Sequence, residues 1–166
     1  ALATIAVATE LELPDAPDAE VAHARALQEI EAARAAVLPH LTEGGFAEAV
    51  CRIVLAGMVS IGSFERRSFR LAKLLAKLPA DTLGNAGAQT NWLTLLKSQA
   101  RITAVAPVEA LNALEQLLPT TVSRERALAV SAAVMMIEPT LANPRSEIIE
   151  FLMGTLGVDP DRVIGM

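Results

Sequence analysis

The chain has 166 residues, of which 52% are hydrophobic, and it carries four Phe, one Trp and no Tyr. Because the apolar residues are mainly Ala, Leu and Val, a disordered chain is excluded and we expect an all-α fold. The net charge of −5 and the few aromatic residues disfavour nucleic-acid binding. One cysteine excludes a disulfide framework and fits a reducing, cytoplasmic setting. The longest apolar run, residues 53–61, is too short to span a membrane, which takes about 20 residues.

Residues 1–17 contain Pro14 and Pro17, and we interpret them as a lead-in or linker, followed by one helical domain over residues 18–166. Since the sequence does not begin with Met, we expect a piece excised from a longer protein, with a domain upstream. Asp18 is predicted to cap a helix that runs to about residue 38. The apolar residues of this helix predict that it packs against the rest of the domain through a single apolar stripe. The stripe consists of Val21, Ala24, Leu27, Ile30, Ala35 and Leu38.

Residues 43–78 predict the centre of the fold. Residues 46–61 are almost uniformly apolar and indicate a buried helix. A tight turn at residues 61–63 should lead into a second, amphipathic helix that lies back on the first. Its predicted inward side chains are Phe64, Leu71, Leu74, Leu75 and Leu78. Its other face carries a basic stripe of Arg66, Arg67, Arg70, Lys73 and Lys77.

The rest of the chain completes a bundle of about seven helices. Ser123 is predicted to cap one helix, Asn143 and Pro144 to open the last long one, and Gly157 to end it, with a short turn from Asp159 and Pro160. The last long helix should bury Ile148, Ile149, Phe151, Leu152 and Leu156. The expected helices are residues 86–103, 107–118, 124–137 and 144–156. The segments 46–78 and 124–157 share a layout, so an internal duplication is an open alternative.

Charge is unevenly distributed. Residues 1–50 carry nine acids and two bases, residues 51–101 two acids and eight bases, and residues 102–166 eight acids and four bases. The basic stripe is therefore an interaction-surface candidate for a protein partner, an upstream domain or an anionic surface. The structural alternative is that it faces solvent or the acidic first helix.

No residue pattern predicts a catalytic site or a cofactor. Cys51 lies within an apolar helix with no activating neighbour in sequence, which is typical of a small core residue. Glu20 and His23 match half of a di-iron motif that needs a second copy, and a surface pair is the simpler interpretation. His40 and Glu43 similarly indicate a polar helix terminus.

Two blocks of sequence carry a family resemblance. Residues 43–75, EGGFAEAVCRIVLAGMVSIGSFERRSFRLAKLL, and residues 98–130, SQARITAVAPVEALNALEQLLPTTVSRERALAV, resemble the carboxy-terminal region of bacterial poly(3-hydroxyalkanoate) synthase-like proteins. The resemblance implies that an α/β-hydrolase-like domain, with any nucleophile, lies upstream. The present chain would then be a non-catalytic accessory or interaction domain of a polyhydroxyalkanoate synthase-like enzyme.

Residues 127–157, ALAVSAAVMMIEPTLANPRSEIIEFLMGTLG, are similar to tellurite-resistance TerB-like domains. That resemblance implies a TerB-like helical bundle and, as an alternative function, a metal- or anion-responsive domain using loop carboxylates. This chain keeps Glu138 in the loop and Glu147 beyond it, whereas a hard cation normally needs several carboxylates. We therefore expect no metal centre. Glu138 and Glu147 are the candidate ligands for any metal ion that the chain does bind. A third function is peripheral binding to a granule or membrane surface through residues 66–77.

Overall fold

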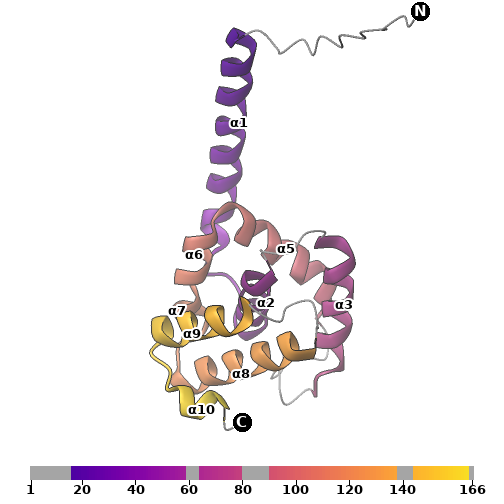
Figure 1. Cartoon of the computed structure of the whole chain (residues 1–166), viewed down its shortest axis with the longest axis vertical. Coiled ribbons are helices and arrows are strands. Elements are labelled where there is room, and N and C mark those ends of the chain that lie inside the picture. The colour runs from indigo at the N-terminus through magenta and orange to yellow at the C-terminus, as the bar shows by residue number, and fades with distance from the viewer. Residues whose placement is uncertain (1–15, 59–63, 80–89, 138–143, 165–166) are drawn as a thin grey trace, which may run out of the picture.

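The computed structural model describes residues 16–58, 64–79, 90–137 and 144–164, and all regular structure in these ranges is helical (Figure 1). This confirms the all-α fold class. The predicted lead-in lies outside the described residues, except that the first helix already includes residues 16 and 17. The elements are α1 (Ala16–Val37), the 3-10 turn η1 (Leu38–His40), α2 (Phe46–Met58), α3 (Phe64–Lys77), α5 (Trp92–Val105), α6 (Pro107–Asn112), α7 (Leu114–Leu117), α8 (Thr121–Ile137), α9 (Pro144–Leu156) and α10 (Pro160–Ile164).

Helix α2 is the centre of the core, as its apolar sequence predicted. It packs against α5, α6, α7, α8 and α9, which surround it in Figure 1. Val50, Ile53 and Val54 have no exposed surface. At Gly57 the contact with α8 is especially close, since an added Cβ would lie 3.0 Å from Cε of Met135. The flexible end of the Met135 side chain thus fills the space beside Gly57.

Helix α1 contradicts the predicted docking by one apolar stripe. It projects from the bundle (Figure 1), and Val21, Leu27 and Ile30 are 62%, 50% and 59% exposed. Positions spaced three residues apart rotate by about 60° per step around a helix, so these side chains do not form one face. The helix contacts the body only near its carboxyl end, mainly at α5.

Helix α3 packs chiefly on α5 and also on α8, among the described residues, rather than lying back on α2 as predicted. Helices α8 and α9, in contrast, pack directly on each other. The segments 46–78 and 124–157 are therefore arranged differently, which gives no support to an internal duplication. Ser68, Leu71 and Leu75 of α3 are buried.

Several helix ends differ from the predicted ones because particular side chains cap them. Asn91 accepts a hydrogen bond from the backbone N–H of Thr94 (3.2 Å), so α5 begins at residue 92 rather than 86. Thr120 caps α8 in place of Ser123: its hydroxyl accepts from the Ser123 N–H (3.1 Å), and the Ser123 hydroxyl accepts from the Thr120 N–H (3.2 Å). This reciprocal pair is a capping-box arrangement that starts the helix three residues earlier.

Two other predictions differ in detail. The helix expected over residues 107–118 is divided into α6 and α7. Phe151, predicted to face inward, is 59% exposed, whereas Ile149, Leu152 and Leu156 of the same helix are buried. The predicted helix end at Gly157 is confirmed, since this residue has a φ of 64°.

Candidate interaction surface on helix α3

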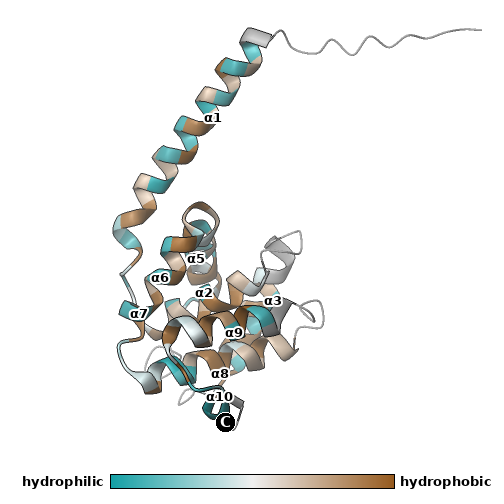
Figure 2. Ribbon diagram, turned by 60° about the vertical axis from the view of Figure 1, so that its left-hand side comes forward, coloured by the Kyte–Doolittle hydropathy of each residue, from teal (hydrophilic) through white to brown (hydrophobic). Residues whose placement is uncertain are grey.

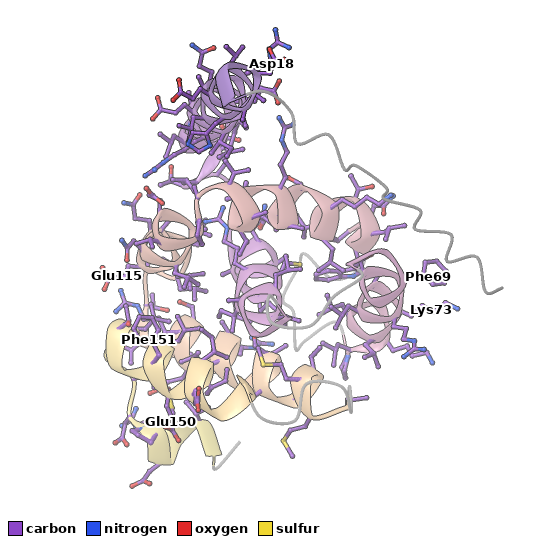
Figure 3. The ribbon with its side chains drawn as sticks, turned by 45° about the horizontal axis from the view of Figure 1, so that its top comes forward. Asp18, Phe69, Lys73, Glu115, Glu150 and Phe151 are labelled. Carbon is purple, nitrogen blue, oxygen red and sulfur yellow. The ribbon has the colours of Figure 1, made fainter. Side chains whose placement is uncertain are left out.

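The described part of the chain contains one exposed helix face that combines several cations with an aromatic ring. We define the α3 cationic face as Phe69, Arg70, Lys73 and Lys77, all of which are exposed. The ammonium nitrogen of Lys73 lies 4.7 Å from the centroid of the Phe69 ring, and Figure 3 shows both side chains pointing away from the rest of the molecule. This distance is within the range of a cation–π interaction.

The helical periodicity of α3 explains why the α3 cationic face is exposed to solvent. Leu71, Ala72 and Leu75 are buried in the core, so residues on the other side of the helix are directed to solvent. Phe69 and Lys73 are one turn apart, which brings the ammonium over the ring. Figure 2 shows the resulting contrast between hydrophobic and hydrophilic sides of the bundle helices.

Of the five predicted interaction residues, the structure places Arg70, Lys73 and Lys77 on this one exposed face. Arg66 and Arg67 belong to the backbone of α3, but their side chains lie outside the described residues. Phe69, which is 52% exposed, was not predicted from the sequence to belong to this face. The i, i+4 spacing from Phe69 to Lys73 was the signal that could have identified it.

The acidic first helix does not neutralise the α3 cationic face. Helix α1 projects from the α5 and α6 side of the bundle, while α3 lies at another side, and the two are well separated in Figures 1 and 3. Of the two structural alternatives for the basic stripe, solvent exposure is therefore the one found for Lys73 and Lys77.

The structure describes one of the two candidate metal ligands, Glu138 and Glu147. Glu147 is exposed in the first turn of α9, and Glu138 lies outside the described part of the chain. Within the described ranges, no group of three or more His, Cys, Asp or Glu side chains is placed to hold a metal ion.

Cys51 is fully buried in α2. Burial raises the pKa of its thiol far above the ordinary range, and the negative charge of Glu48 raises it further. The thiolate needed for nucleophilic chemistry is thus strongly disfavoured. This agrees with the expectation that Cys51 is a core residue.

The histidine pairs lie on the surface. Glu20 and His23 are on the exposed part of α1. His40 Nδ1 lies 2.7 Å from Oε2 of Glu43 at the polar turn after η1, where both side chains are more than half exposed. These positions agree with the surface interpretation of both pairs.

Arg52 is a structurally important residue whose role the sequence did not predict. It is fully buried in α2; its Nε donates to Oε1 of Gln99 (2.6 Å), and its Nη1 donates to the backbone oxygens of Leu41 (2.6 Å) and Ala110 (3.4 Å). Nη2 has no partner within the described part of the chain. Burial lowers the pKa of the guanidinium, while Glu48 opposes this change. Arg52 thereby joins α2 to α5, α6 and the turn beneath α1.

Among the described residues, no helix has the length and apolar character needed to cross a membrane. Comparison of the chain with protein-family models, with curated proteins and with solved structures gave no match.

Proposed function

We propose that this chain is a non-catalytic helical interaction domain that uses the α3 cationic face to bind a protein segment containing acidic and apolar side chains. The observation that carries the proposal is the exposed Phe69 ring with Lys73 over it. An aromatic anchor beside cations provides both apolar contact area and charge complementarity. On the basis of the sequence resemblance, we further propose that the domain has a TerB-like helical architecture and belongs to a cytoplasmic, polyhydroxyalkanoate synthase-like protein.

A protein partner is favoured over a granule or membrane surface by the orientation of α3. An interfacial helix inserts its apolar side into the lipid boundary. Here Leu71 and Leu75, on the apolar side of α3, are fully buried in the core. Phe69 is the one large apolar side chain that the described part of α3 exposes, so the area available for insertion is small.

A labelled probe peptide tests the proposal. The probe is a helical peptide with Glu and Leu at helical spacing, and the comparison peptide has Lys in place of Glu. We expect the full chain to bind the Glu peptide preferentially, as measured by fluorescence anisotropy. Lys73→Glu with Lys77→Glu should weaken binding by about tenfold or more, because like charges would then face each other.

Lys97→Glu with Arg101→Glu is the matched control, since both residues are exposed on α5 and one turn apart. This control should bind the Glu peptide like the original chain. Equal binding of the two peptides, or equal losses in the two double variants, would refute the proposal. Co-sedimentation with anionic vesicles that requires Lys73 and Lys77, without peptide binding, would instead establish the surface-binding function.

A further inference from the structure

Helix α1 has a long segment that touches no other element of the described structure. All residues from Asp18 to Ala32 are exposed, and the helix of 22 residues is about 33 Å long at 1.5 Å per residue. A single helix of this kind gains little stability from its own hydrogen bonds, and most helices in proteins depend on packing against a neighbour. The exposed segment is therefore suited to a partner.

The base of α1 is fixed, which gives the exposed segment a defined direction. Val37 is buried in a small apolar cluster with Ile102, Ala106 and Ala110. An ion pair joins Arg34 to Glu109 of α6. Because these contacts hold the helix at its carboxyl end, it extends away from the bundle (Figure 1), and Asp18 lies at the free end of the helix in Figure 3.

One face of the exposed segment combines acidic and apolar side chains. Glu20, Ala24, Leu27 and Glu31 follow the i, i+4, i+7, i+11 spacing that aligns residues along a helix. All four are exposed, with Leu27 at 50%. We call this set the α1 acidic face. It presents an apolar centre with a carboxylate at each end.

The α3 cationic face is complementary to the α1 acidic face. Arg70, Lys73 and Lys77 repeat at i, i+3 and i+7, and Phe69 adds an apolar centre. A helix lying along α3 could thus place Leu27 near Phe69 and its carboxylates near the ammonium groups. Helix α1 of one molecule projects away from the bundle and lies apart from α3 of the same molecule (Figures 1 and 3), so this contact requires two molecules.

Charge also argues against two α1 helices packing on each other. The exposed segment has four acidic residues, Asp18, Glu20, Glu29 and Glu31, against the single base Arg25, so a pair of such segments would repel. Helix α3 has five bases and one acid in its sequence. The favourable pairing is therefore between α1 and α3.

We propose that the partner of the α3 cationic face is the α1 acidic face of a second copy of this chain, with the two copies exchanging their α1 helices about a two-fold axis. This inference rests on the proposed function of the α3 cationic face and identifies its occupant. A two-fold arrangement makes each contact twice and closes the assembly as a dimer.

Sedimentation equilibrium of the full chain tests this proposal, and we expect a dimer that weakens with added salt, since exposed charges are screened over about 10 Å at 0.1 M. Glu20→Lys with Glu31→Lys should raise the dissociation constant about tenfold or more, and so should Lys73→Glu with Lys77→Glu. Combining all four substitutions in one chain should restore the dimer, because the charges are exchanged across the contact.

Asp18→Lys with Glu29→Lys is the matched control, since it makes the same charge change on the opposite side of α1 and should leave the dimer intact. Circular dichroism of each variant verifies that the helices remain folded. A chain that stays monomeric, or a dimer that the charge exchange does not restore, overturns the proposal. If the chain is monomeric but still binds the Glu peptide through Lys73 and Lys77, the proposed dimer is refuted. The proposed function of the α3 cationic face then stands.

Discussion

Helices α1 and α2 lie in opposite environments, one exposed and one buried. Helix α2 has two charged residues among 13, Glu48 and Arg52, and most of the side chains described in it are buried. Helix α1 has six Asp, Glu and Arg residues among 22 and is exposed over most of its length. Burial thus stabilises α2, whereas α1 is held by contacts at its base and gains further stability only from a partner.

The largest expected effect comes from Arg52→Ala in α2. The substitution leaves Oε1 of Gln99 and the Leu41 carbonyl without their donor and opens a cavity. We expect the free energy of unfolding to fall by about 4 kcal/mol, as measured by urea titration.

A double variant separates the hydrogen-bond loss from the cavity. Arg52→Met with Gln99→Leu replaces both partners by apolar side chains of similar size, and it should recover part of the stability lost in Arg52→Ala. A loss below about 1 kcal/mol for Arg52→Ala would contradict the role assigned to this buried network.

A matched pair of isoleucines compares the two helices directly. Ile53 of α2 is fully buried, whereas Ile30 of α1 is 59% exposed. Ile53→Ala should lower the free energy of unfolding by about 3 kcal/mol, while Ile30→Ala should change it by less than about 0.5 kcal/mol in the monomer. Similar losses in thermal or urea unfolding would show that α1 is packed against the bundle after all.

The buried thiol predicts a pH dependence for α2. In the unfolded chain Cys51 ionises near its ordinary pKa of about 8.5, but in the folded chain its pKa is raised by burial and by Glu48. Above the unfolded pKa the unfolded state binds fewer protons, so stability falls as pH rises. We expect a loss of about 1 kcal/mol by pH 9.5 from this group.

The Cys51→Ala variant supplies the control for this pH dependence. It has no thiol to ionise, so its urea midpoint should depend less on pH between neutral and alkaline conditions. Parallel pH profiles for the two proteins would show that the thiol already ionises in the folded chain.

The all-α class, the central position of α2 and the end of α9 at Gly157 could be predicted from sequence, because each follows from local composition or from one residue's conformation. The amphipathic character of α3 was predictable for the same reason. The exposure of Lys73 and Lys77 followed from helical spacing, although the function of that face did not.

The burial of Arg52 had no local signal, since its acceptors come from Leu41, Gln99 and Ala110, which are distant in sequence. The projection of α1 was also missed, because Val21 and Ile30 have the composition of a docking stripe without its geometry. Tertiary contacts between remote segments decided the burial of Arg52, whereas the angular spacing of the apolar residues within α1 was the local signal for its exposure.

The smallest expected effect concerns the base of α1. Arg34→Gln removes the ion pair with Glu109. Because the Arg34 side chain is 51% exposed and the Glu109 side chain 30%, the global free energy of unfolding should change by only about 0.5 kcal/mol. Hydrogen exchange should nevertheless accelerate within α1 and not within α2, because the pair fixes the projecting helix to α6. Unchanged exchange in α1 would indicate that Val37 and its apolar cluster hold the helix without the ion pair. Faster exchange together with weaker dimerisation would connect the orientation of α1 to its docking on a second copy.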